Sequence, residues 1–84
     1  MNVSLQIIFL GTAASIPTNS RALPSVVVKR KGELLMFDCG EGVQRQMIRA
    51  SVGFHRKMKI FITHMHGDHV LGLPGLLQTM SLLD

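Results

Sequence analysis

Three histidines and one aspartate fall within residues 64–69, which read His-Met-His-Gly-Asp-His. The preceding residues 59–63 are mostly β-branched or aromatic and predict a short, mostly buried strand. Because side chains alternate along an extended chain, His64 and His66 would project to the same side and could bind one ion together. Gly67 would then allow the backbone to turn.

After this turn, Asp68 and His69 would face the same hollow and add an oxygen and a nitrogen ligand. Imidazole and carboxylate bind zinc at roughly 2.0–2.2 Å, and a catalytic zinc takes about three protein ligands and a water. Four ligands therefore indicate two incomplete zinc sites, with further ligands supplied from elsewhere. Two ions about 3.5–4 Å apart can clamp the attacking and leaving oxygens of a phosphoryl transfer. A polar turn with chance histidines, or a tag remnant, is the alternative.

Three apolar stretches ahead of the cluster predict strands at residues 5–10, 25–29 and 33–38. Residues 30–32, Arg-Lys-Gly, suit a short hairpin with one residue at positive φ, a conformation for which the glycine is fitted. We expect the three strands to form one sheet.

A helix on this sheet is predicted by Val43, Met47 and Ile48, which recur at helical spacing. Glu41 is expected in the first turn of this helix, where a carboxylate favours the positive end of the helix dipole, and Gly53 follows its end.

A second helix is predicted after the cluster, because Leu73, Leu76, Leu77 and Met80 keep the spacing of one helical face. Pro74 fits its first turn. Leu82 and Leu83 make it apolar on more than one face, so burial on both sides is expected.

Asp38 stands at the end of a predicted strand and has two possible roles. It could cap the following helix, or it could accept the second N–H of a metal-bound histidine. The loop at residues 11–24 contains small residues, hydroxyls and one cation, so Thr12 and Arg21 are candidate contacts for a substrate phosphate. An ordinary connector is the alternative for this loop.

The formal net charge is +4, from nine Lys and Arg against five Asp and Glu, which favours a polyanionic partner. Six of the cations fall in two clusters, at residues 29–31 and 56–59. A single cysteine, Cys39, cannot form an internal disulfide and indicates a reducing, cytoplasmic location. No apolar run approaches the roughly 18 residues of a membrane span, so no membrane partner is expected.

Residues 37–46 read Phe-Asp-Cys-Gly-Glu-Gly-Val-Gln-Arg-Gln, and residues 63–77 read Thr-His-Met-His-Gly-Asp-His-Val-Leu-Gly-Leu-Pro-Gly-Leu-Leu. Both stretches resemble the N-terminal part of the ribonuclease Z family of tRNA 3′-processing endonucleases. Gly11-Thr12 followed by Pro17-Thr18 and Arg21 is similar to that family's first loop. His-x-His-x-Asp-His alone marks the wider metallo-β-lactamase superfamily, and the other stretches narrow the resemblance to the tRNA-processing branch.

This resemblance implies an α/β fold with a mixed sheet, the first half of an αβ/βα sandwich that holds two zinc ions. It implies that His64 and His66 bind one zinc and that Asp68 and His69 bind the other, with Asp68 as the general base. Precursor tRNA is the implied substrate. The family's later ligands and its tRNA-gripping arm have no counterpart after His69.

We therefore interpret residues 1–84 as one N-terminal fragment of such a domain, without internal boundary and without activity alone. The inner face of its sheet would lack its second sheet, so homodimerisation or other association through that face is expected. Two other functions remain open: a hydrolase of a small ester or lactam from the same superfamily, or a non-enzymatic RNA-binding or metal-binding module.

Overall fold

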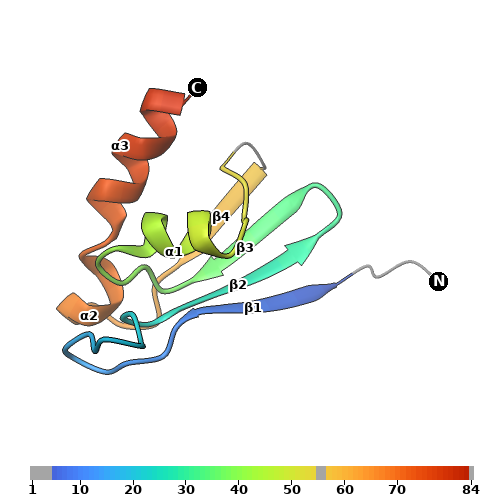
Figure 1. The fold of residues 1–84 in the computed structure, drawn as a ribbon. Helices are drawn as coiled ribbons and strands as arrows, with labels where there is room; N and C mark the ends of the chain where they lie inside the picture. The colour runs from blue at the N-terminus through green and yellow to red at the C-terminus, as the bar shows by residue number, and fades with distance from the viewer. Residues whose placement is uncertain (1–4, 55–56, 84) are drawn as a thin grey trace.

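The structure, a computed structural model, describes residues 5–54 and 57–83. Arg56 and the adjoining His55, from the second predicted basic cluster, lie outside the described residues. Strands and helices follow one another along the chain as shown in Figure 1. They are β1 (Gln6–Gly11), β2 (Ser25–Arg30), β3 (Glu33–Phe37), α1 (Val43–Arg49), β4 (Lys57–Phe61), α2 (Gly67–Val70) and α3 (Leu73–Leu83).

The four strands form one mixed sheet in the order β1-β2-β3-β4, so the predicted α/β class and single sheet are confirmed. The pairs β1–β2 and β2–β3 are antiparallel, whereas β3 and β4 are parallel. A parallel pair needs a crossover connection, and α1 lies within it. The parallel arrangement brings the C-terminal ends of β3 and β4 to the same edge, from which the His-Asp cluster follows.

One face of the sheet carries the hydrophobic core. Val27, Leu34 and Met36 are fully buried there, beneath Met47 of α1 and Leu76 of α3. Figure 1 shows both helices on the same side of the sheet. Burial of side chains of this size contributes roughly 1.5–3 kcal/mol each, which holds the helices on this face.

The opposite face of the sheet is left without cover. Its apolar residues form a row across the strands, in which Phe9 pairs with Val26, Val26 with Phe37, and Phe37 with Phe61. The rings of Phe37 and Phe61 stack with their centroids 5.2 Å apart. The exposed fractions of Ile7 and Phe9 are 57% and 69%. This face is the one for which the sequence predicts a missing second layer.

Several local predictions need correction. The strand expected at residues 59–63 is β4, which begins at Lys57 and ends at Phe61. It is not mostly buried, because helices cover only one of its faces and Phe61 is exposed on the other. In the β2–β3 hairpin, the residue with positive φ is Lys31, at 54°, and not the neighbouring glycine. Arg30 pairs with Glu33, which leaves a two-residue loop, and the first residue of that loop takes the positive φ.

The helices also differ from prediction in detail. Helix α1 begins at Val43 with Gly42 as its N-cap, so Glu41 precedes the first turn. Ile48 is 65% exposed, because a helical step of about 100° carries it off the face that buries Met47. Pro74 lies in the first turn of α3, as predicted, but Leu82 of that helix is 77% exposed. None of the helices in the described part of the chain is long and apolar enough to cross a membrane.

Candidate metal centre

The three histidines of the cluster come together at the edge of the sheet where β3 and β4 end. The ring centroid of His64 lies 4.5 Å from that of His66 and 3.9 Å from that of His69. His66 has extended backbone angles and precedes α2, while Asp68 and His69 lie within that short helix. A strand end followed by one helical turn therefore gathers three imidazoles and a carboxylate into one place.

Asp38 lies against this cluster. The backbone of Asp38 has a φ of 67°, a left-handed conformation that aspartate tolerates better than most residues, and it turns the chain at the end of β3. Its Oδ2 lies 3.0 Å from Nδ1 of His69. The two groups are close but not well aligned, since this buried Nδ1 makes no hydrogen bond of good geometry. Of the two predicted roles of Asp38, helix capping does not occur, because the N-cap of α1 has no side-chain hydrogen bond.

Thr63 fixes the position of the Asp38 carboxylate. Its backbone N–H donates to Oδ1 at 2.8 Å, and its hydroxyl lies 2.8 Å from Oδ2. Burial would raise the pKa of Asp38, but the hydrogen bonds from Thr63 and the contact with His69 outweigh burial and hold the pKa below its usual value. The carboxylate is therefore ionised at neutral pH and lies beside Nδ1 of His69, whereas Nε2 of His69 lies beside Asp68.

Asp68 is held by the loop at residues 12–24. The backbone N–H of Ser15 donates to Oδ2 of Asp68 at 3.0 Å, and the same oxygen lies 3.5 Å from Nε2 of His69. The hydrogen bond from Ser15 holds the pKa of the Asp68 carboxyl below its usual value, and neighbouring His69 and His66 act in the same direction. Asp68 is therefore ionised and able to accept a proton or to bind a cation.

Close backbone contacts join the turn after β3 to the turn between α2 and α3. Cys39 N–H donates to the carbonyl of His69 at 2.7 Å, and Gly72 N–H donates to the carbonyl of Cys39 at 2.9 Å. A Cβ atom on Gly72 would lie only 1.9 Å from the carbonyl oxygen of Gly40. Only glycine permits this approach, so the Asp-Cys-Gly turn directly sets the position of His69.

The donor set fits zinc in its chemistry, since imidazole nitrogen and carboxylate oxygen are zinc ligands. Within residues 5–54 and 57–83, however, no group of three or more His, Cys, Asp or Glu side chains is arranged to hold a metal ion. Within the cluster, His64 contacts both His66 and His69, with ring centroids 4.5 and 3.9 Å apart, and Oδ2 of Asp68 lies 3.5 Å from Nε2 of His69. The division of these four donors between two ions stays a prediction.

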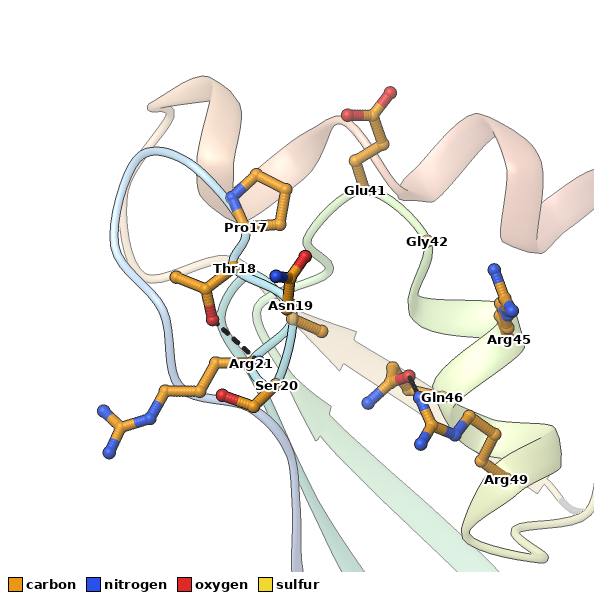
Figure 2. Close-up of a pocket in the computed structure, with 11 residues that line it drawn as sticks. Pro17, Thr18, Asn19, Ser20, Arg21, Glu41, Gly42, Arg45, Gln46 and Arg49 are labelled. Atoms are coloured by element: carbon orange, nitrogen blue, oxygen red, sulfur yellow. Dashed lines mark hydrogen bonds between the residues drawn. The ribbon is translucent and has the colours of Figure 1, made fainter.

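The two candidate phosphate contacts lie apart from one another. Arg21 is exposed and lines a hollow of about 240 Å³ between its loop and α1. Thr12 is exposed at the start of the loop and does not line that hollow. Figure 2 shows the Arg21 side chain pointing outward, with its backbone N–H hydrogen-bonded to the Thr18 hydroxyl.

Three features of the site were not predicted from the sequence. They are the hydrogen bonds of Thr63 to Asp38, the hydrogen bond from Ser15 to Asp68, and the presence of Arg45 and Arg49 in the lining of the same hollow as Arg21. The spacing of Arg45 and Arg49, four residues apart on a predicted helix, was a visible signal for a shared face. Nothing local in the sequence marks the other two, because they join segments 25 and 53 residues apart.

Comparison with family models and with curated proteins finds several proteins that are similar to this chain. The family model described as Anti-Pycsar protein Apyc1 matches residues 5–82. Ribonuclease Z of Methanosarcina mazei is 58% identical over 79 residues, which cover 94% of this chain and 26% of that protein. Ribonuclease Z of Natronomonas pharaonis is 55% identical over 98% of this chain and 26% of its own length. The chain thus spans about a quarter of the length of these curated relatives.

Solved structures agree with the sequence comparison. Human tRNase Z, short form, superposes with a TM-score of 0.86 at 51% identity, covering 90% of this chain and 29% of that protein. The metallo-β-lactamase fold protein YhfI of Bacillus subtilis gives 0.79 at 21% identity, over 94% of this chain and 33% of that protein, which supports the fold alone. The chain therefore belongs to the family described as Anti-Pycsar protein Apyc1, has a metallo-β-lactamase fold, and matches the N-terminal part of ribonuclease Z.

Proposed function

We propose that this chain supplies the N-terminal part, and the first metal ligands, of a zinc-dependent endoribonuclease that removes the 3′ trailer from precursor tRNA. The observation that carries the proposal is the pairing of the His-Asp cluster with 50–58% identity to curated relatives named ribonuclease Z. Residues 1–84 would form one continuous part of the domain, inactive without the remainder.

The ligands would divide into two pairs, with His64 and His66 binding one zinc and Asp68 and His69 binding the other. When bound, two zinc ions supply positive charge that stabilises the charge developing on phosphate and water oxygens. Asp38 would keep His69 oriented through its contact with Nδ1. Asp68, ionised at neutral pH, would accept the proton of the attacking water. Hydrolysis of the phosphodiester would leave a 3′-hydroxyl on the tRNA.

Association through the uncovered sheet face is part of the same proposal. The row containing Phe9, Phe37 and Phe61 would be covered by the remainder of the domain or by a second copy of this chain. A cytoplasmic location is supported by Cys39, which is buried and forms no disulfide.

A chimera tests the proposed function. Residues 1–84 would replace the matching N-terminal segment of Methanosarcina mazei ribonuclease Z, and the chimera would be incubated with zinc and a precursor tRNA carrying a 3′ trailer. We expect endonucleolytic removal of the trailer. A purified chimera that folds and binds tRNA but releases no trailer would contradict the proposal.

The Asp68→Ala chimera tests the role of the base. We expect it to bind tRNA nearly as well as the parent chimera and to lose cleavage. If the variant cleaved within about tenfold of the parent, a barrier difference of about 1.4 kcal/mol, Asp68 would not be the base. A small ester or lactam hydrolysed in preference to tRNA would favour the alternative of a small-molecule hydrolase.

A further inference from the structure

A strained backbone turn in the loop at residues 12–24 contacts the candidate base. The backbone N–H of Ser15 donates to Oδ2 of Asp68 at 3.0 Å. The φ of Ser15 is 64°, in the left-handed region that residues other than glycine rarely occupy. Figure 1 shows this loop, which follows β1, beside α2. The residue of the loop that contacts Asp68 is therefore also the residue at which the loop is strained.

The backbone around Ser15 forms a γ-turn. Ile16 N–H donates to the carbonyl of Ala14 at 2.7 Å, which closes a three-residue turn with Ser15 at its centre. A γ-turn with a positive φ at its central residue is the rare and strained kind. Such strain persists only where the surrounding structure holds it, and it is found most often at functional sites. Here the turn directs the N–H of Ser15 toward α2.

The backbone of the loop is hydrogen-bonded on both sides of this turn. Before the turn, Ala13 N–H donates to the carbonyl of Ala22 at 2.8 Å. After it, Thr18 N–H donates to the carbonyl of Arg21 at 2.9 Å. Ser15 therefore lies in a loop whose own contacts keep its N–H in place.

Asp68 has little support from its own helix. It lies in α2, which has four residues, and the N-cap of that helix makes no side-chain hydrogen bond. Oδ2 of Asp68 lies 3.5 Å from Nε2 of His69, which is long for a hydrogen bond. The bond from Ser15 is shorter, at 3.0 Å, and it comes from a residue 53 positions away in the sequence. The loop therefore sets the orientation of the carboxylate.

We propose that Ser15 is a positioning residue for Asp68, which acts through its backbone N–H and not through its side chain. The inference rests on the proposed function, in which Asp68 accepts a proton from the attacking water. A general base must lie about 2.6–3.2 Å from the atom whose proton it takes, and a displacement of about 1 Å can lower the rate by about 10²-fold. The γ-turn at Ser15 holds the carboxylate in the one orientation that this transfer requires.

Valine at position 15 tests this role, because β-branched residues rarely adopt a positive φ. In the chimera with Methanosarcina mazei ribonuclease Z, Ser15→Val should open the γ-turn and direct the N–H away from Asp68. We expect kcat on precursor tRNA to fall at least about tenfold, while KM and the affinity for tRNA stay within about twofold. Ser15→Gly should keep kcat within about threefold, because glycine retains the N–H and readily adopts a positive φ.

Ser51→Val is the matched control. Ser51 is also exposed and has a φ of 58°, but it follows α1, and its N–H donates to the carbonyl of Ile48 at 3.1 Å. The control introduces the same side chain into the same backbone region, and kcat should stay within about twofold of the parent value. Equal losses of kcat in the two valine variants would overturn the proposal. An unchanged kcat in Ser15→Val, with a native circular dichroism spectrum, would also overturn it.

Hydrogen exchange measures the contact without metal and without activity. The dipeptide Ala-Ser occurs at residues 14–15 and 50–51 of this chain. The 84-residue chain labelled with carbonyl-¹³C alanine and ¹⁵N serine therefore gives one HNCO signal for Ser15 and one for Ser51. In EDTA, Asp68→Ala should speed exchange of the Ser15 amide at least about tenfold and leave exchange of the Ser51 amide within about twofold. Exchange at Ser15 that does not depend on Asp68 would overturn the proposal, whether or not the valine variant folds.

The positioning role and the proposed function fail in different ways. If the parent chimera cleaves and Ser15→Val is equally active, the positioning role is rejected and the proposed function is kept. If the parent chimera binds tRNA without cleaving it, the proposed function is rejected together with the proton transfer. Exchange at Ser15 that depends on Asp68 would then show that Ser15 holds this carboxylate for another purpose.

Discussion

Gly72 offers a test of how tightly the cluster depends on the turn after β3. In the Gly72→Ala variant, the new Cβ would lie 1.9 Å from the carbonyl oxygen of Gly40 and 2.9 Å from that of Cys39. These neighbours are backbone atoms, so the two turns must move apart rather than adjust a side chain. The backbone hydrogen bonds that join Gly72 to Cys39, and Cys39 to His69, would lengthen or break.

The expected loss of stability follows from these contacts. Overpacking at a rigid site costs roughly 1–3 kcal/mol, and each of two lost hydrogen bonds about 0.5–1.5 kcal/mol, so the variant should lose about 2–6 kcal/mol of unfolding free energy. Urea unfolding followed by circular dichroism measures the change. In the chimera, cleavage should fall as well, because His69 shifts relative to Asp38.

Gly53→Ala is the matched control, since nothing lies within 4 Å of a Cβ atom at this exposed position. Its unfolding free energy should stay within about 1 kcal/mol of the parent value. If Gly72→Ala lost less than about 1 kcal/mol and the chimera kept its activity, the close contact between the two turns would not determine the position of His69.

Three further predictions follow from burial and charge. Burial raises the pKa of the Cys39 thiol to about 11, so at pH 8 iodoacetamide should alkylate it roughly 100-fold more slowly than an unburied thiol, as measured by mass spectrometry; rapid alkylation of the folded chain would contradict its burial. The lowered pKa of Asp38 stabilises the folded state above the carboxyl's ordinary pKa, so the unfolding free energy should fall as the pH drops below about 4, and Asp38→Asn should reduce this dependence. Light scattering should show that the parent chain associates. The double substitution Ile7→Thr with Phe9→Ser on the uncovered face should weaken this association, and the control substitution Ile48→Thr should leave it unchanged. A parent chain that stays monomeric at all concentrations would contradict the prediction.

Much of the fold could be predicted because its elements carry strong local patterns. Val26, Val27 and Val28 indicate a strand, and Val43 with Met47 indicates a helix face. The uncovered sheet face was expected from the family resemblance, which implies a second sheet packed against the first. Element ends were less accurate: Glu41 was expected in the first turn of α1, but the helix begins at Val43 with Gly42 as its N-cap, which depends on the turn that precedes it.

The cluster was predictable as a set of ligand types, but its supporting contacts were not. His64, His66, Asp68 and His69 stand within six residues, so their proximity is nearly dictated by the chain. The hydrogen bonds of Thr63 to Asp38 depend instead on the parallel pairing of β3 with β4. Long-range contacts of this kind are set by topology, and no local spacing reports them.

Zinc content tests the central claim most directly, namely that this chain contributes two donors to each of two zinc sites. The chimera with Methanosarcina mazei ribonuclease Z, dialysed against a mild chelator and analysed by mass spectrometry, should hold about two zinc ions per chain. His64→Ala with His66→Ala should reduce this to about one, and the isolated 84-residue chain should retain far less than one. Two zinc ions retained by the double variant, or by the isolated chain, would contradict the account.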